Sequence, residues 1–329
     1  AQLAWLARAR RWSHIHVHSC ADAAMIALFA SIVGGVPYSL TLHGRISDYG
    51  PAQDVKWREA FFGTTVTQTL MRNRDWLAFF EARGRPDAMP ADAPGPDEVD
   101  VGAMGVDLAA FTRNSSYAAA SGASVKLVSC GRLHPGKGHA KLIEAVALLR
   151  KRGIAAELAV LGEGPARAEL ESLVASLGLT QAVELPGAKS EREVREALER
   201  SHVFALASRD EAIGVATMEA MCMGLPVIVT GVGGVAELVR DGVDGLLVAP
   251  ERADQVADAV ATLMADPARA AAMGASGAAR MPPKCAYHVW QWTMSASIPW
   301  PLKARHVASA RSGEISATGQ PANWLPSTL

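Results

Sequence analysis

Apolar and polar positions alternate along this chain in two arrays of short β-branched runs and longer helical stretches. In the first array, the pattern predicts strands at 14–18 and 36–41, a helix at 21–33, and another helix that begins near residue 66. Strands that alternate with helix-length segments are typical of parallel sheets joined by crossover helices. The first array therefore predicts a short α/β region.

The second array is longer and more regular. It predicts strands at 125–130, 156–161, 183–185, 203–206 and 226–229, and helices at 139–152, 166–177, 191–200, 217–223 and 235–239. This order predicts a doubly wound sheet, whose ligands bind at the carboxyl ends of the strands.

Two stretches without periodicity divide the chain. Residues 84–96 are rich in Gly, Pro, Asp and Ala, and residues 114–124 are mostly small. We therefore expect a partial first domain at 1–120 and a second domain at 121–281. Residues 282–329 carry four of the eight tryptophans but no periodicity, and we expect a disordered tail, with an aromatic docking segment as the alternative.

Composition and charge exclude several classes of protein. Half of the 329 residues are hydrophobic, and the formal net charge is -1, so no global field favours nucleic acid. The four cysteines form no C-x-x-C pair, which argues against a disulfide framework or a zinc site. The longest apolar run, 23–33, is far shorter than a membrane span. We expect a soluble cytoplasmic protein.

The first candidate site is the sequence GRLHPGKG at 131–138, between a predicted strand and a predicted helix. Its first residue, Gly131, lets the backbone approach a ligand, while Arg132 and Lys137 supply charges that suit a phosphate. An ordinary turn with solvated charges is the alternative, because Gly-rich turns are common.

Two carboxylates frame the second candidate site, a loop that leads into a helix. Glu211 is placed to accept hydrogen bonds from sugar hydroxyls, and Glu219 to hold a ribose diol. The N–H groups of Gly214 and Val215 then face a diphosphate at the helix N-terminus. A capping carboxylate with a solvated helix face is the alternative for this pair.

A third Gly-rich turn, at 231–234, includes Gly233 and Gly234. Together the three turns describe a pocket for a nucleoside diphosphate that carries a hydroxylated group. The sequence contains no Walker A motif and no G-x-G-x-x-G, which argues against ordinary NTPase or dinucleotide chemistry.

These motifs, in this order, resemble the family 4 retaining glycosyltransferases of GT-B fold. The resemblance rests on GRLHPGKG, the turn GEGP that begins at Gly162, EAIGVATMEAMCMGLP at 211–226 and GGVAELV at 233–239. Within this family, the sequence is most similar to enzymes of bacterial exopolysaccharide or lipid-linked glycan assembly. It implies two Rossmann-like domains, the first incomplete here because the chain starts at Ala1 without the family's opening strands.

The resemblance also implies roles for single residues. Arg132 and Lys137 match the pair that neutralises the departing diphosphate, Glu211 the contact to the donor sugar, and Glu219 the ribose contact. Gly162, Gly233 and Gly234 match turns near the donor. In TLHG at 41–44, His43 matches a histidine beside the transferred sugar.

The implied activity is hexosyl transfer from a nucleoside-diphosphate sugar to a glycan or lipid-linked acceptor, with retention. No D-x-D tripeptide occurs, so we expect no metal and no cofactor. A truncated relative that binds nucleotide sugar without turnover is the first alternative, and a nucleotide-using enzyme of another class is the second.

The first residues suggest one further partner. Trp5, Arg8, Arg10, Arg11 and Trp12 form a basic and aromatic stretch that suits an anionic membrane surface. A solvated helix face is the simpler interpretation, and a weak contact at the inner face of the membrane is the alternative.

Overall fold

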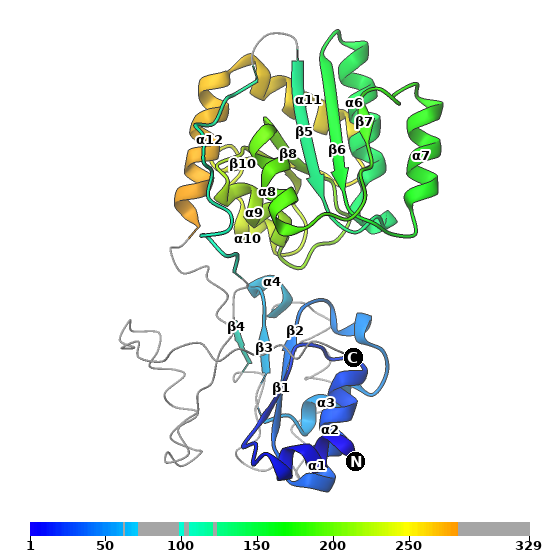
Figure 1. Ribbon diagram of the computed structural model, residues 1–329, viewed down its shortest axis with the longest axis vertical. Coiled ribbons are helices and arrows are strands. Elements are labelled where there is room, and N and C mark those ends of the chain that lie inside the picture. Colours follow the sequence, from blue (N-terminus) through cyan, green and yellow to red (C-terminus); the bar gives the residue numbers. More distant parts are fainter. Residues whose placement is uncertain (62, 72–98, 102–104, 121–123, 282–329) are drawn as a thin grey trace. The chain divides into compact units, whose positions relative to one another are not determined.

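The computed structural model describes residues 1–61, 63–71, 99–101, 105–120 and 124–281. It contains two parallel sheets with helices packed on them, which confirms the expected α/β class (Figure 1).

The first sheet has four parallel strands in the order β1-β2-β3-β4. The strands are β1 (Ile15–Val17), β2 (Tyr38–Leu42), β3 (Gly63–Thr65) and β4 (Val99–Val101). The helical segments of this region are α1 (Gln2–Ala9), α2 (Asp22–Gly34), η1 (Ile46–Tyr49), α3 (Gln53–Arg58) and α4 (Gln68–Met71).

Strand β2 is buried along its whole length and forms the centre of the first core. Tyr38, Leu40 and Leu42 are at most 1% exposed, and they pack with residues of α2 and with Trp57 of α3. The Tyr38 hydroxyl donates to the Lys56 carbonyl at 2.5 Å, so its polar atom is satisfied inside the core.

The second sheet has six parallel strands in the order β10-β9-β8-β5-β6-β7. They are β5 (Ser124–Cys130), β6 (Ala155–Leu161), β7 (Val183–Glu184), β8 (Val203–Leu206), β9 (Val227–Thr230) and β10 (Gly245–Val248). The order reverses beside β5, since β6 lies on one side of it and β8 on the other. This reversal is the place where a doubly wound sheet opens a crevice for a ligand.

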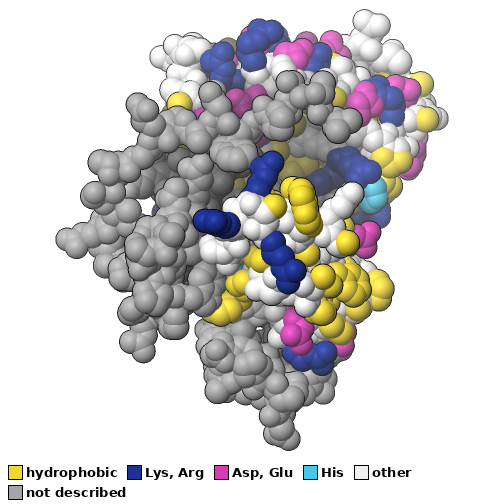
Figure 2. Space-filling model, turned by 60° about the horizontal axis from the view of Figure 1, so that its bottom comes forward, with side chains coloured by type: hydrophobic (Ala, Val, Ile, Leu, Met, Phe, Trp, Pro, Cys, Tyr) yellow, Lys and Arg dark blue, Asp and Glu magenta, His cyan; other side chains and the backbone are white. Residues whose placement is uncertain are grey.

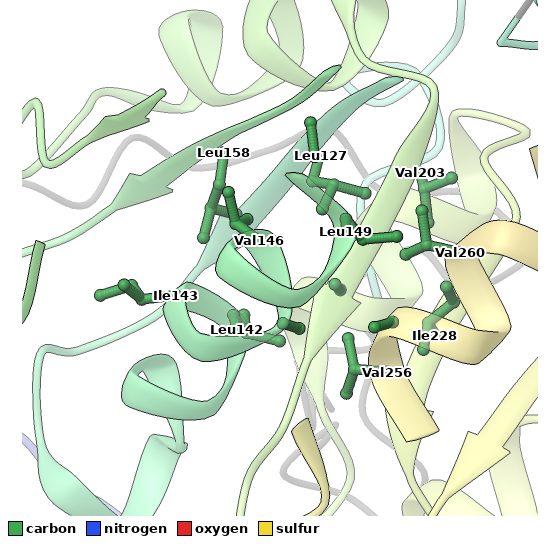
Figure 3. Packing of buried hydrophobic residues seen from close by; sticks show 14 of the residues in the cluster. Leu127, Leu142, Ile143, Val146, Leu149, Leu158, Val203, Ile228, Val256 and Val260 are labelled. Carbon is green, nitrogen blue, oxygen red and sulfur yellow. The ribbon is translucent and has the colours of Figure 1, made fainter. Parts of the chain in front are cut away.

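Helices cover both faces of the second sheet. They are α6 (His139–Lys151), α7 (Arg167–Ser176), α8 (Glu191–Arg200), α9 (Val215–Cys222), α10 (Val235–Leu238), α11 (Ala253–Ala265) and α12 (Pro267–Arg280), with a 3-10 turn η3 (Pro135–Lys137) before α6. On one face, α6 and α11 pack against β5, β8 and β9 through Leu127, Val146 and Val260, among others (Figure 3). Alternate strand residues, such as Phe204, point to the other face of the sheet, where they form a second hydrophobic cluster with α8 and α9.

The segment before β5 packs on the second sheet's core. Val106 and Phe111 are 3% and 4% exposed and belong to the same cluster as β8 and β9. The Arg113 guanidinium donates to the carbonyls of Glu199 and Met223, which holds the segment against α8 and α9. The domain boundary near residue 120 stays a prediction.

Most predicted elements of both arrays are present, with ends that differ by one or two residues. The pattern missed β3 and β4, which have three residues each, and also α3, β10, α11 and α12. The hypothesis of a disordered tail at 282–329 concerns residues outside those described. Among the described residues, no helix is both long and apolar enough to cross a bilayer.

Candidate functional site

The turn after β5 brings a lysine to the carboxyl edge of the second sheet. Residues 135–137 form η3, and Gly138 then takes a left-handed conformation with φ +66°. A Cβ at Gly138 would lie 1.8 Å from the Ala207 carbonyl oxygen, so only glycine lets this turn approach the end of β8. The close approach places the Lys137 side chain beside the loop that follows β8.

Lys137 and Glu211 form an ion pair at this edge. The Lys137 Nζ lies 2.6 Å from Glu211 Oε2, and their side chains are 31% and 12% exposed. The Ser208 hydroxyl donates to the same oxygen at 3.2 Å. Two residues 74 positions apart in the sequence are thus brought together as a charged pair that a substrate can reach.

The third Gly-rich turn supports the backbone under Glu211. The Gly234 N–H donates to the carbonyls of Glu211 and Ala212, at 3.2 and 3.1 Å. Gly233 has φ +53°, and a Cβ there would lie 1.9 Å from the Glu211 carbonyl oxygen. Gly233 and Gly234 therefore shape the loop that holds Glu211.

The N-terminus of α9 lies at the end of that loop. Gly214 is its N-cap, in a left-handed conformation with φ +79°. Within the described residues, the N–H groups of Val215 and Ala216 have no acceptor, whereas those of Thr217 and Met218 donate to the Gly214 carbonyl. Unpaired N–H groups at a helix N-terminus favour an anion.

Glu219 lies one turn further along α9 and is partly buried. Burial, with a smaller contribution from Glu191, raises the pKa of its carboxyl to about 7. Burial first, and the charge of Glu219 second, raise the pKa of the Cys130 thiol at the carboxyl end of β5 to about 11. No side-chain hydrogen bond of Glu219 occurs in the described part of the chain, so its oxygens can accept from a ligand.

Arg132 and Gly162 complete the edge. The Arg132 side chain is exposed and has no partner among the residues that the structure describes. A Cβ at Gly162 would lie 2.0 Å from the Gly131 carbonyl oxygen, so the turns after β5 and β6 pack backbone to backbone. The Arg132 guanidinium is thus free to bind an anion at the end of β5.

One residue that supports this edge, His139, was not predicted from the sequence. His139, the first residue of α6, is 2% exposed and lies under Gly131, whose Cβ position is 3.7 Å from its ring. Burial lowers the pKa of His139 to about 4, so the ring is neutral at pH 7. Its spacing with Leu142, Ile143 and Val146 was the available signal, since these residues share the buried face of α6.

His43 belongs to the first sheet, directly after β2. Its Nε2 lies 3.3 Å from Nδ1 of His18, which directly follows β1, and the two rings are tilted with centroids 5.6 Å apart. Burial and the neighbouring His18 lower the pKa of His43. Sequence reasoning missed His18, although the alternation His14, His16, His18 indicated that the three share one face of a strand.

A row of polar side chains continues from this pair along the same sheet. His14 Nε2 and His16 Nδ1 each lie 2.7 Å from the Ser39 hydroxyl, and His16 Nε2 lies 2.8 Å from Thr41 Oγ1. Thr41 in turn bonds Thr64 of β3 at 2.6 Å. Burial lowers the pKa of both His14 and His16 to about 4, so these rings are neutral hydrogen-bonding groups at pH 7.

The predicted donor-site residues thus collect at one edge of the second sheet, and His43 stands at the end of a strand in the first sheet. The carboxyl edge of the second sheet offers two cations and the free N–H groups of a helix N-terminus to an anion. It also offers two carboxylates to hydroxyl groups. These are the contacts that a nucleoside diphosphate with an attached sugar requires.

Comparison with known proteins gives a consistent result. Residues 118–280 match the family described as Glycosyl transferases group 1. A Salmonella typhimurium protein that carries the name of a colanic acid biosynthesis glycosyltransferase, WcaL, is 33% identical over 231 residues, which are 66% of this chain and 54% of that protein. The 2-deoxystreptamine glucosyltransferase of Streptomyces kanamyceticus is 28% identical over 291 residues, which are 80% of this chain and 74% of that enzyme.

Solved structures agree on the fold. Anabaena HepE in complex with UDP-glucose superposes with a TM-score of 0.68 at 20% identity, covering 84% of this chain and 75% of that one. The expected GT-B class is therefore confirmed. The chain spans about half the length of the WcaL protein that it matches.

Proposed function

Since the domain at residues 118–280 belongs to the glycosyl transferases group 1 family, we propose that this protein transfers a hexosyl group from a nucleoside-diphosphate sugar to an acceptor hydroxyl. The observation that supports this most strongly is the convergence of Lys137, Glu211 and the α9 N-terminus at the carboxyl edge of the second sheet. The nucleotide in the HepE complexes and the names of the relatives support the same class of donor.

In the proposed reaction, the acceptor oxygen forms a bond to the anomeric carbon, and the bond from that carbon to the diphosphate oxygen breaks. Its electron pair leaves with the diphosphate, and an oxygen of the departing diphosphate takes up the proton that the acceptor hydroxyl loses. Arg132, Lys137 and the N–H groups at the start of α9 stabilise the charge that develops on the leaving group. We propose that these groups make a metal ion unnecessary, and that the configuration at the anomeric carbon is retained.

The two carboxylates have separate roles in this proposal. Glu211, fixed by Lys137 and Ser208, accepts from hydroxyls of the donor sugar. Glu219 accepts from the ribose hydroxyls of the nucleotide, because its carboxyl is partly buried beside Cys130 and no described side chain donates to it. His43 faces the transferred sugar from the first sheet.

The acceptor in this proposal is a glycan or lipid-linked glycan of exopolysaccharide assembly, as the name of the WcaL relative suggests. Such an acceptor places the protein in the cytoplasm, at the inner face of the membrane.

Calorimetric titration tests the donor site directly. The chain is titrated with UDP-glucose, GDP-mannose and ADP-glucose in EDTA, as are Lys137→Ala and Glu219→Ala. Lys141→Ala serves as the matched control, because Lys141 lies one turn further along and pairs with Glu144. We expect one nucleotide sugar to bind without metal, and affinity to fall at least about tenfold in both site variants but not in the control.

The result that contradicts the proposal is a folded chain that binds none of the three donors. Binding without transfer to any acceptor, even when lipid-linked glycans are offered, favours the alternative of a relative that binds nucleotide sugar without turnover.

A further inference from the structure

The two cations at the carboxyl edge of the second sheet differ in their partners. The Arg132 side chain is exposed and has no partner within the described part of the chain. The Lys137 ammonium instead donates to Oε2 of Glu211 at 2.6 Å, and 31% of the lysine side chain is exposed. A diphosphate that contacts Lys137 therefore lies close to the negative charge of Glu211.

Several contacts hold the Glu211 carboxylate in this position. Ser208, which is 1% exposed, donates its hydroxyl to Oε2 at 3.2 Å. The Gly234 N–H donates to the Glu211 carbonyl at 3.2 Å, and a Cβ at Gly233 would lie 1.9 Å from the same carbonyl oxygen. The Glu211 side chain is 12% exposed, so solvent screens its charge only in part. A bound anion thus meets a carboxylate that is fixed in place.

This local charge acts against a nearly neutral background. The formal net charge of the chain is -1, and Figure 2 shows Lys and Arg side chains close to Asp and Glu side chains at the top of the view. Interspersed charges of both signs produce little field at a distance, and salt screens the remainder over about 10 Å. The groups next to the diphosphate therefore decide how strongly an anion binds.

A nucleotide sugar and the free nucleoside diphosphate differ in how they meet this carboxylate. The sugar presents hydroxyls that donate to Glu211, and these hydrogen bonds offset the repulsion between carboxylate and diphosphate. The free nucleoside diphosphate lacks these hydroxyls. Its terminal phosphate has a second pKa of about 6, so at pH 8 it also carries one more negative charge than the nucleotide sugar. Glu211 therefore opposes the free nucleotide more than the donor.

We propose that Glu211 makes this edge discriminate against the nucleoside diphosphate product, and so promotes its release after each transfer. The inference rests on the proposed function and concerns the same site. When the sugar passes to the acceptor, its hydrogen bonds to Glu211 are lost. At pH 8 the leaving diphosphate then gives to water the proton that it took from the acceptor, and its charge increases beside the carboxylate.

A purely structural role for Glu211 predicts the opposite sign. If the carboxylate only orients the Lys137 ammonium, its removal loosens the lysine and weakens the binding of every diphosphate. If the carboxylate repels the product, its removal frees Lys137 for the phosphate and tightens the binding of the nucleoside diphosphate. A gain in affinity also cannot come from a damaged fold.

Calorimetric titration of the full chain at pH 8 in EDTA tests the proposal. The ligands are UDP-glucose, GDP-mannose and ADP-glucose, each compared with its own nucleoside diphosphate. Glu211→Gln removes the charge and keeps the size of the side chain, whereas Glu211→Asp keeps the charge. Glu144→Gln is the matched control, because Glu144 pairs with Lys141 on α6 at 2.9 Å.

We expect Glu211→Gln to bind the nucleoside diphosphate on the order of tenfold more tightly, and the nucleotide sugar on the order of tenfold more weakly. Glu211→Asp should weaken the binding of the nucleotide sugar and leave the affinity for the nucleoside diphosphate as it is. Glu144→Gln should change neither affinity. Circular dichroism of every variant confirms that the fold is kept.

Two outcomes overturn the inference and leave the proposed function intact. One is a nucleoside diphosphate affinity that stays the same or falls in Glu211→Gln, which assigns the carboxylate to the orientation of Lys137. The other is an equal gain in Glu144→Gln, which assigns the effect to the net charge of the molecule. A folded chain that binds none of these ligands contradicts the proposed function, and this inference with it.

Discussion

The carboxyl edges of the two sheets are built from different chemistry. At the second sheet, full charges dominate, since Lys137 and Glu211 pair at 2.6 Å and the α9 N-terminus adds free N–H groups. At the first sheet, His18 and His43 directly follow β1 and β2 with ring nitrogens 3.3 Å apart, and burial, with a smaller contribution from His18, lowers the pKa of His43. One edge is suited to an anionic leaving group, and the other to neutral hydroxyls.

The largest expected effect comes from removing a positive charge at the carboxyl edge of the second sheet. Lys137→Ala removes one of the two cations that we propose stabilise the departing diphosphate, and we expect kcat for sugar transfer to fall by on the order of 10²–10³. Lys141→Ala, one helical turn away, should leave kcat unchanged. Steady-state kinetics with saturating donor make the comparison. Equal losses in both variants would show that the charge acts through the fold and not through the leaving group.

The turn that carries Lys137 should be costly to alter. Gly138→Ala forces a left-handed alanine whose Cβ collides with the Ala207 carbonyl, and we expect a loss of about 2–5 kcal/mol in the free energy of unfolding. Gly153→Ala is the control, since Gly153 has φ +82° but nothing within 4 Å of its Cβ position. It should lose about 1–2 kcal/mol. Urea denaturation measures both, and equal losses would exclude the close approach as the cause.

The pH dependence of donor affinity tests Glu219. The ribose hydroxyls donate to the ionised carboxyl, and burial sets its pKa near 7, so protonation below that pH opposes binding. We expect the affinity for the bound nucleotide sugar to fall about tenfold from pH 8 to pH 6. The diphosphate of a nucleotide sugar does not titrate in this range. Glu219→Gln should bind more weakly at pH 8 and show no such fall, whereas an unchanged slope would assign the titration to another group.

The smallest expected effect concerns the carboxyl edge of the first sheet, where we propose that His18 acts as a positioning residue for His43. Burial first, and His18 second, lower the pKa of His43. His18→Gln should therefore raise the pKa of His43 and move the acid limb of the kcat/KM profile to higher pH, with a small loss of kcat at the optimum. Ser39→Ala, which breaks the contacts to His14 and His16, should leave the limb in place. A shift in both variants would assign the effect to the sheet as a whole.

Strand and helix positions of the second region were largely predictable, because its apolar runs are long and regular. Helix 191–200 and strand 203–206 were predicted with the ends that the structure has. Strand β3 was missed because Gly63, Thr64 and Thr65 give no apolar run, and its place is fixed by pairing with β2 and by Trp57 packing over Gly63. Short strands depend on partners that a local pattern does not contain.

The residue types that stand after each strand could be predicted from local pattern, because a strand, a turn and a helix are local. Parallel strands also expose their carboxyl ends at one edge. Tertiary structure decided which of these residues meet. It paired Lys137 with Glu211 across 74 positions, left Glu219 without a described partner, and set His18 beside His43. Distances and burial arise from packing between distant segments, so pKa values and ion pairs cannot be read from spacing along the chain.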